Sequence, residues 1–402
     1  YFNNEFEQDW ITGDGFWSFI FTTFAPGASS SSDPFWWGLC VQGVILSCDP
    51  GLSSIPAGEN VTQILYETQE TTSYAAYGQM DWRFADQWTL TAGVRWTREE
   101  KDFRAGQAYL SNDARALMRV FPGGYADLEK SWTEVSPKLG LAYELNEDSM
   151  MYASYAEGFK SGGFFGVNQN IADFVRDQYE PEYANSLEIG YKSQHMDNRV
   201  RFNLTWFRND FEDKQEQSVQ LDSSTNTVAT VFSNAASVIY SGVELETQVI
   251  FNEYFRAFFN YGYLSAEYDE FVTDLNPNDD GVVGAQPEDA SHLNPRNAPG
   301  FTYGAGGTLA FPVGNGTVEI FGKFTVIDEI DGSLLNLQQS KIAQRDDVSA
   351  SIGYYRDKWS VVGYGKNLTD ERFEAFFPIA TLFAAGFVNR PRTFGVEFTY
   401  EM

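Results

Sequence analysis

Apolar and polar side chains alternate along most of the chain with a period of two residues. In the segment 88–96 the apolar residues share one face of an extended strand: Trp88, Leu90, Ala92, Val94 and Trp96. The same alternation recurs in 200–206 and 318–326. Successive side chains of a strand point to opposite faces, so each segment turns one face toward an apolar environment and the other toward water. No run of about 18 apolar residues, the length of a membrane-spanning helix, interrupts this pattern.

The predicted strands are joined alternately by short and long connections. Short turns are predicted near 85–87, 146–148, 195–198, 252–253, 313–315 and 356–358. Long connections are predicted at roughly 102–130, 161–181, 213–236, 269–298, 328–341 and 367–389. Six hairpins and a final strand give about 13 strands from residue 71 onward, and residues 1–10 add another. Short turns on one side and long loops on the other are typical of outer-membrane barrels, whose short turns face the periplasm.

This pattern predicts an all-β protein, a transmembrane antiparallel β-barrel with about 14 strands in this chain. Residues 1–402 show no internal repeat or low-complexity linker that would divide them into separate domains. We expect each strand to pair with the next one along the chain. The side chains expected to face lipid are Trp88, Val94, Trp96, Phe202, Leu204, Trp206 and Phe398.

Composition and charge narrow the function classes. The chain has 43% hydrophobic and 16% aromatic residues, yet its mean hydropathy is negative, as expected when apolar residues are dispersed among polar ones. The net charge of −29 would repel nucleic acid phosphates, so we do not expect nucleic-acid binding. His195 and His292 are the only histidines and no serine lies in a nucleophile motif, so we do not expect an enzyme.

The segment 11–60 is predicted to be one long surface loop. It holds both cysteines of the chain, Cys40 and Cys48, with seven residues between them. A disulfide bond that closes a small ring is favoured over two free thiols, and it would place this loop in an oxidising compartment.

Aromatic and basic side chains of the predicted loops are candidates for ligand binding. Aromatic rings there would either stack against a ligand or pack against one another near the membrane surface. The arginines would either meet an anionic ligand or remain solvated charges. The candidates are Trp17, Trp36, Trp37, Arg115, Arg119, Phe164, Phe165, Phe376, Phe377 and Phe383.

One predicted loop has the spacing of ion ligands, and no other cofactor is indicated. Its alternating oxygen side chains are Asp274, Asn276, Asn278 and Asp280, and Gly281 follows them. This resembles half of a calcium loop, but Glu288 comes one position too late for the final bidentate ligand. The alternatives are a structural calcium ion in a surface loop and a solvated acidic loop.

Several segments together resemble the barrel of proteobacterial TonB-dependent receptors. They are Ala75 to Gln79, Trp88 to Lys101, Tyr152 to Gly163, Pro181 to Ser193, Asn234 to Glu246, Asn367 to Phe373 and Pro391 to Gly395. The last strand, 393–402, also resembles the signal read by the barrel-assembly machinery, although the family usually ends on an aromatic residue and this chain ends on Met402.

The resemblance implies a barrel of about 22 strands filled by an N-terminal plug. That plug would carry the segment, or TonB box, that binds the TonB complex. Neither is found in residues 1–402, so we expect this chain to be the C-terminal part of a barrel with its plug absent. The implied setting is the outer membrane of a Gram-negative bacterium, with lipopolysaccharide, membrane lipid and a small-molecule ligand as partners.

Three functions are compatible with the sequence. The first is TonB-dependent active uptake of a scarce ligand, with ferric siderophores the commonest cargo in the resembling family. The second is a passive, porin-like channel, which would require residues 1–10 to pair with 393–402 and close a barrel of about 14 strands. The third is a surface structural or adhesive barrel protein, in which the acidic and aromatic loops would be the working part.

Overall fold

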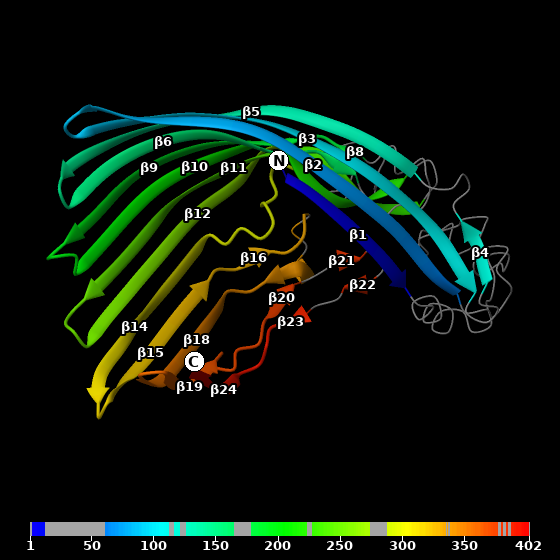
Figure 1. Ribbon diagram of the computed structural model, residues 1–402. Coiled ribbons are helices and arrows are strands. Elements are labelled where there is room, and N and C mark those ends of the chain that lie inside the picture. Colours follow the sequence, from blue (N-terminus) through cyan, green and yellow to red (C-terminus); the bar gives the residue numbers. More distant parts are fainter. Residues whose placement is uncertain are drawn as a thin grey trace.

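The computed structural model describes most of the chain as one curved antiparallel sheet (Figure 1). The described residues are 2–12, 61–111, 116–120, 126–164, 178–222, 227–273, 288–334, 336, 338–376, 379–380, 383–384 and 387–401. Each main strand pairs with its neighbours along the chain, which confirms the predicted meander. No helix among these residues has the length and apolar character needed to cross a membrane.

Fourteen strands form the main path of the sheet, as predicted. In order they are β1 (Phe2–Thr12), β2 (Val61–Ala85), β3 (Trp88–Ser111), β5 (Ala126–Asn146), β6 (Ser149–Lys160), β9 (Glu182–His195), β10 (Val200–Asp222), β11 (Thr227–Ile250), β12 (Phe255–Thr273), β14 (Phe301–Val313), β15 (Gly316–Ile327), β18 (Arg345–Arg356), β19 (Trp359–Lys366) and β24 (Thr393–Tyr400).

The remaining elements are short and lie in the connections. Two of them pair onto the main sheet: β4 (Ala116–Val120) on β3 and β13 (Glu288–Asp289) on β12. The others are β7 (Gly163–Phe164), β8 (Gln178–Tyr179), β16 (Ile330–Asp331), β17 (Lys341–Ile342), β20 (Glu374–Phe376), β21 (Ile379–Ala380), β22 (Phe383–Ala384), β23 (Phe387–Val388) and a 3-10 helix, η2 (Gln338–Ser340).

All six predicted short turns are confirmed, and they lie along one edge of the sheet, at the left of Figure 1. We call this the short-turn edge and the opposite side the loop end. Residues with positive φ close several of these turns, including Asp197 (φ 54°), Gly314 (φ 60°) and Asp357 (φ 44°). Tight hairpins need such left-handed residues, because their turns must match the right-handed twist of the flanking strands.

Three of the predicted long connections are shorter than expected. The ranges 102–130, 213–236 and 269–298 were predicted as loops, but strands β3, β5, β10, β11 and β12 continue into them. The prediction ended each strand where the apolar alternation ended. Backbone pairing does not need an apolar face, however, and cross-strand ion pairs such as Arg104 with Asp127, at 3.4 Å, replace apolar contacts in the extended parts.

The outer, convex face of the sheet changes character along β3. Its outward side chains run from Trp88 to Trp96 and then continue with Arg98 and Glu100. Eight residues of strand span about 26 Å, close to the height of about 25 Å expected for the apolar band of an outer-membrane barrel, which aromatic residues flank at both edges. The apolar part of the outer face of β3 thus has the length expected of such a band, and charged residues follow it.

None of the side chains predicted to face lipid lies in a protein core. Val94, Trp96, Leu204, Trp206 and Phe398 are exposed on the surface of the sheet. Trp88 and Phe202 are half-buried against neighbouring rings, and the ring centroids of Trp88 and Tyr143 lie 4.5 Å apart. The structure thus agrees with an outer face that meets lipid.

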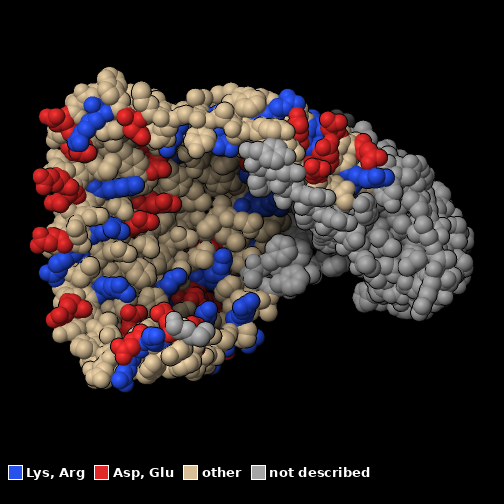
Figure 2. Space-filling model, in the orientation of Figure 1, with Lys and Arg blue, Asp and Glu red and all other residues tan. Residues whose placement is uncertain are grey.

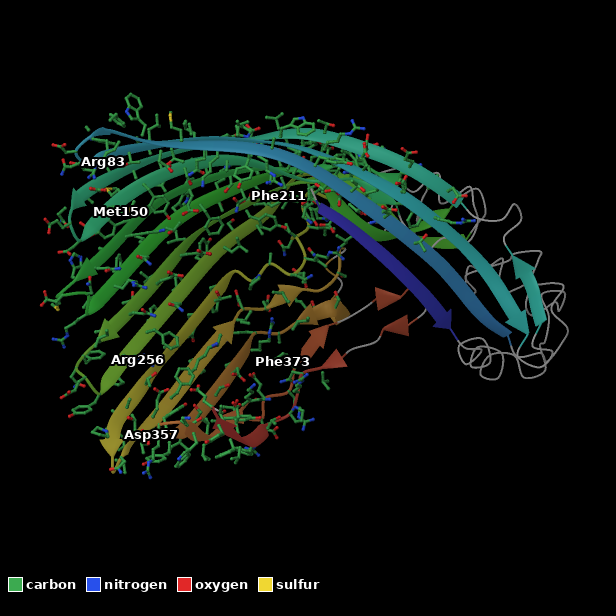
Figure 3. All side chains as sticks on the ribbon, in the orientation of Figure 1. Arg83, Met150, Phe211, Arg256, Asp357 and Phe373 are labelled. Carbon is green, nitrogen blue, oxygen red and sulfur yellow. The ribbon has the colours of Figure 1, made fainter. Side chains whose placement is uncertain are left out.

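The buried apolar residues gather at the loop end, where connections fold back onto the strands. One cluster contains Phe103, Ala105, Ala126 and Phe164. A larger cluster contains Ala236, Val238, Tyr268, Phe271, Ala290 and Leu334. Figure 3 shows Phe211, which packs against the second cluster, toward this end, whereas Arg83, Arg256 and Asp357 lie near the short turns. The core therefore orders the loop end rather than the wall itself.

The two edge strands of the sheet do not pair with each other. Among the described residues, β1 pairs only with β2, and β24 pairs only with β19. Figure 1 shows these edges on different sides of an opening in the curved sheet. The seam that would close a barrel of 14 strands, as the passive-channel alternative requires, is therefore not formed.

Candidate functional site

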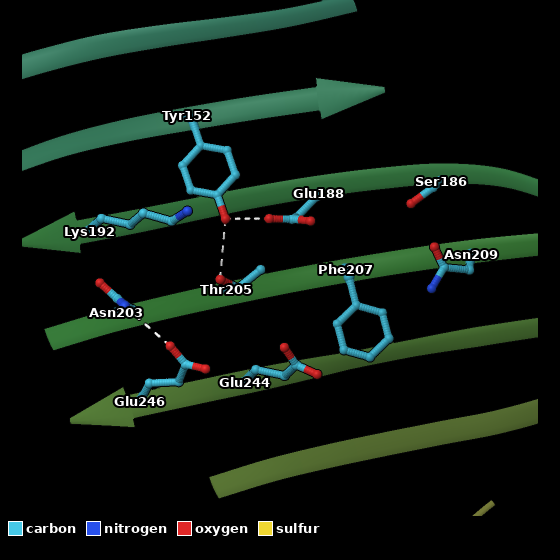
Figure 4. Close-up of a pocket in the computed structure, with 10 residues that line it drawn as sticks. All are labelled: Tyr152, Ser186, Glu188, Lys192, Asn203, Thr205, Phe207, Asn209, Glu244 and Glu246. Atoms are coloured by element: carbon cyan, nitrogen blue, oxygen red, sulfur yellow. Dashed lines mark hydrogen bonds between the residues drawn. The ribbon is translucent and has the colours of Figure 1, made fainter. Parts of the chain in front are cut away.

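The concave inner wall carries a polar pocket of about 540 Å³ between β6 and β11 (Figure 4). The pocket follows from the alternation of side chains along a strand. Every lining residue of β10 has an odd number, and its even-numbered neighbours point outward. The lining residues are Tyr152, Ser186, Glu188, Lys192, Asn203, Thr205, Phe207, Asn209, Glu244 and Glu246.

Hydrogen bonds fix several of these side chains across neighbouring strands. The Tyr152 hydroxyl donates to Glu188 and lies 3.4 Å from the Thr205 hydroxyl. Asn203 donates to Glu246 at 3.2 Å. The Lys192 ammonium lies 4.8 Å from the centroid of the Tyr152 ring. Because these contacts cross from β6 to β9 and β10, and from β10 to β11, they lock the register of the wall at the pocket.

Glycines opposite the pocket's two aromatic rings let those rings lie against the wall. Tyr152 is the direct cross-strand partner of Gly190, and Phe207 is that of Gly242. A Cβ atom at Gly190 would lie 2.4 Å from the Tyr152 ring, and one at Gly242 would lie 2.8 Å from the Phe207 ring. An aromatic residue that covers a cross-strand glycine is a known stabilising pair in sheets.

The pocket has an acidic balance that suits a cationic group. Three glutamates and one lysine are among its lining residues, and two of the glutamates, Glu244 and Glu246, come from the same strand. Figure 2 shows the hollowed face on which acidic and basic side chains gather. Within the described parts of the chain, no group of three or more His, Cys, Asp or Glu residues has the arrangement of a metal site.

Charged contacts also tie the loop end to the strands. Glu180 lies between β8 and β9, where the Lys130 ammonium donates to its carboxylate and Trp132 Nε1 donates at 3.3 Å. The bond from Lys130 lowers the pKa of Glu180 below its ordinary value. Farther along the rim, a 2.9 Å ion pair with Glu329 raises the pKa of Lys341.

A network of hydrogen bonds holds the segment 367–373, which lies between β19 and β24. The Asn367 amide donates to the main-chain oxygens of Glu371, at 2.9 Å, and Arg390, at 3.1 Å. The Asn389 side-chain amide also donates to the main-chain oxygen of Glu371, at 3.0 Å. The main-chain N–H of Arg392 donates to Asp370 and holds the pKa of that carboxyl below its ordinary value. These bonds hold a segment without regular structure in a defined conformation.

Four of the sequence-predicted ligand residues lie in described elements. The Phe164 ring is buried and stacks on Phe103 with the ring centroids 5.3 Å apart, so this packing would have to open before the ring met a ligand. Arg119 lies in β4, Phe376 in β20 and Phe383 in β22, where only the backbone is described. No contact between these residues and a ligand is tested, and their roles stay predictions.

The other predicted site residues lie outside the described part of the chain, and their roles also stay predictions. For ligand binding they are Trp17, Trp36, Trp37, Arg115, Phe165 and Phe377. The disulfide pair Cys40 and Cys48 and the calcium candidates Asp274, Asn276, Asn278 and Asp280 belong to the same group.

Sequence reasoning missed the residues that line the inner-wall pocket. Glu188 and Lys192 lie in a segment that resembled the receptor family, as do Glu244 and Glu246. The available signal was their position on the polar face of alternating strands. That signal is shared by every inward residue, so only the cross-strand register shows which of them meet.

Comparison with known proteins gives the family. The family described as "TonB dependent receptor-like, beta-barrel" matches residues 1–368. The chain therefore belongs to the β-barrel family of TonB-dependent receptors. This agrees with the resemblance seen in the sequence and with the all-β meander.

Relatives and solved structures point the same way. The chain is 24% identical over 335 residues to the ferric-pyoverdine M114 receptor PbuA of Pseudomonas sp., covering 80% of this chain and 35% of the relative. It is 25% identical over 203 residues to the probable TonB-dependent siderophore receptor PiuA of Acinetobacter baumannii, covering 50% of this chain and 24% of the relative. The chain thus spans about a third or less of these curated relatives.

The solved structures show a shared fold. The ferric yersiniabactin uptake receptor FyuA from Yersinia pestis aligns with a TM-score of 0.67 at 17% identity, covering 85% of this chain and 48% of FyuA. The ferric-catecholate import receptor Fiu from Escherichia coli aligns with a TM-score of 0.59 at 17% identity, covering 85% of this chain and 51% of Fiu.

Proposed function

We propose that this chain is the barrel part of an outer-membrane transporter that takes up a ferric siderophore by TonB-dependent active transport. The observation that carries the proposal is the family match over residues 1–368, on a sheet with an apolar outer face and a polar inner wall. The named siderophore receptors among the relatives support the cargo class. The protein would act as a transporter rather than an enzyme, in the outer membrane of a Gram-negative bacterium.

The proposed partners follow from the two faces and the two ends of the sheet. The outer face would meet membrane lipid, and the charged residues beyond Trp96 would lie at the level of lipopolysaccharide headgroups. The inner wall, with its acidic pocket, would meet a plug that links the receptor to the TonB complex. The exposed strand β24 would be read by the barrel-assembly machinery.

The test is uptake of labelled iron by a Gram-negative strain that lacks its own siderophore receptors. The strain would carry the full gene and receive radioactive iron in a panel of catecholate, hydroxamate and mixed siderophores. We expect uptake of at least one complex, and we expect it to disappear when TonB is deleted. Uptake that persists without TonB would instead indicate a passive channel. Binding and uptake of none of the complexes would overturn the siderophore assignment.

A further inference from the structure

Two consecutive residues of β10, Gln215 and Glu216, are both buried at the loop end of the sheet. Successive side chains of a strand point to opposite faces, so burial of both means that both faces of β10 are covered at this point. A bulge lies directly before them, with register shifts between Phe211 and Gln215 and a positive φ of 51° at Asp213. Bulges re-aim the side chains that follow them.

On one face, Gln215 and its cross-strand partner Asn234 hold the connection between β6 and β9. The Gln215 amide donates to the main-chain oxygens of Ser161 and Glu180, each at 3.0 Å, which lie at the two ends of that connection. Asn234 accepts a hydrogen bond from the Glu180 N–H at 2.8 Å and donates to the Glu180 oxygen at 2.8 Å. These four bonds fix both ends of the connection to a single position on the β10–β11 hairpin.

On the other face, Glu216 holds the connection between β12 and β14. Its side chain is 2% exposed, and its Oε2 atom lies 2.9 Å from Arg296 Nη2, in an ion pair without the alignment of a hydrogen bond. Lys214 forms a second ion pair with the same carboxylate. Burial of a carboxylate costs free energy unless cations compensate its charge. The burial of Glu216 therefore requires its ion pairs, and the pair with Arg296 in turn fixes the position of that arginine.

We propose that Gln215 and Glu216 couple these two extracellular connections, so that a displacement of one is transmitted through two adjacent backbone positions to the other. Both are positioning residues, and the use of this coupling in ligand capture rests on the proposed transport function. The connections need no direct contact with each other, because each is bound to an opposite face of the same rigid strand.

The experiment is amide hydrogen exchange on the full-length, ligand-free protein carrying Glu216→Gln. This change keeps the side-chain shape and removes the charge that Arg296 and Lys214 share. We expect exchange to quicken by about tenfold or more at 290–297, where Asn297 N–H donates to Asp331. We also expect faster exchange across the strand at 178–182, which includes the Glu180 N–H held by Asn234.

The reference within the same molecule is the Asp370 N–H, which donates to the Asn367 oxygen at 2.9 Å in the connection between β19 and β24 and should not change. The matched control is Glu144→Gln at the short-turn edge, which breaks the exposed ion pair with Arg83 and should leave both coupled connections unaltered.

A second pair of variants guards against a failure of Glu216→Gln to assemble. Arg296→Gln lies on the connection itself and is one-third exposed, so it disturbs the strand less, and it should give the same two-sided result. Asn234→Ala should act in the reverse direction and quicken exchange at 290–297. Faster exchange confined to the mutated face would overturn the coupling. This outcome does not depend on the cargo, so it is distinct from a failure of the siderophore assignment.

Discussion

The two faces of β10 show how one strand serves two environments. Toward lipid it presents Phe202, Leu204 and Trp206, and toward the interior it presents Asn203, Thr205 and Phe207. Leu204 and Trp206 are exposed on the outer surface of the sheet and Phe202 is half-buried there, whereas the inner residues take part in cross-strand hydrogen bonds and glycine-aromatic contacts. The outer face is thus specified by hydrophobicity alone, and the inner face by the identity of particular partners.

This difference determines what each face tolerates. The outer face should accept changes of shape but reject charge, because lipid adapts to shape and cannot solvate an ion. The inner face should accept charge but reject added volume wherever a ring lies over a glycine. Substitutions that add charge or volume on either face distinguish these two sensitivities.

The largest effect is expected for a charge placed on the outer face. Leu204→Arg should lower the free energy of unfolding in lipid vesicles by about 2–4 kcal/mol, because the cation would lie near the middle of the membrane band. Its control is Thr205→Arg, one residue along and facing the pocket glutamates. Urea titration of both variants should show a clear loss only for the first. Equal losses of unfolding free energy in the two variants would mean that lipid does not cover one face and water the other.

A smaller effect is expected for added volume on the inner face. At Gly242 a Cβ atom would lie 2.1 Å from the main-chain oxygen of Tyr263, so Gly242→Ala should cost about 1–3 kcal/mol. Gly322 is the outer-face control, since a Cβ atom there meets nothing within 4 Å. The same unfolding measurement should find Gly322→Ala close to neutral. A neutral Gly242→Ala would show that the wall adjusts its spacing freely.

A single hydroxyl group tests the hydrogen bonding of the inner wall. Tyr152→Phe removes the donor to Glu188 and should cost about 1 kcal/mol, with the ring left in place over Gly190. Tyr261→Phe, on the outer face of β12, is the matched change and should cost less. A reversed order of the two unfolding free energies would contradict the proposed role of the inner network.

The smallest effect is expected at the loop end, where charged contacts are open to water. The pKa of Glu180 lies below its ordinary value of 4.5, so its contribution to stability is present above about pH 4.5. That contribution is lost as the pH falls through the lowered pKa, because protonation ends the attraction to Lys130. Protection of the amides at 178–182, corrected for intrinsic exchange, should fall between about pH 6 and about pH 3. Lys130→Met should abolish most of this pH dependence.

The sequence by itself determined the wall of the protein. Alternation of apolar and polar residues predicted the strands, and turn-forming residues placed all six short turns. Six hairpins, the final strand and the segment 1–10 together gave the 14 strands of the main path. These features are local, because side-chain periodicity and turn chemistry act over a few residues. The family resemblance was readable for the same reason, since each of its segments is a short run of local sequence, such as Ala75 to Gln79 within β2 or Asn367 to Phe373 after β19.

Only the tertiary structure decided where the strands end and which polar residues meet. Gln215 and Glu216 fell in a predicted loop, because nothing local marks a bulge that is held by Glu180 and Arg296 from distant connections. The pocket likewise joins Tyr152, Glu188 and Thr205 from three strands. A one-residue slip of register would separate them while leaving every local pattern intact, and register is a property of the assembled sheet.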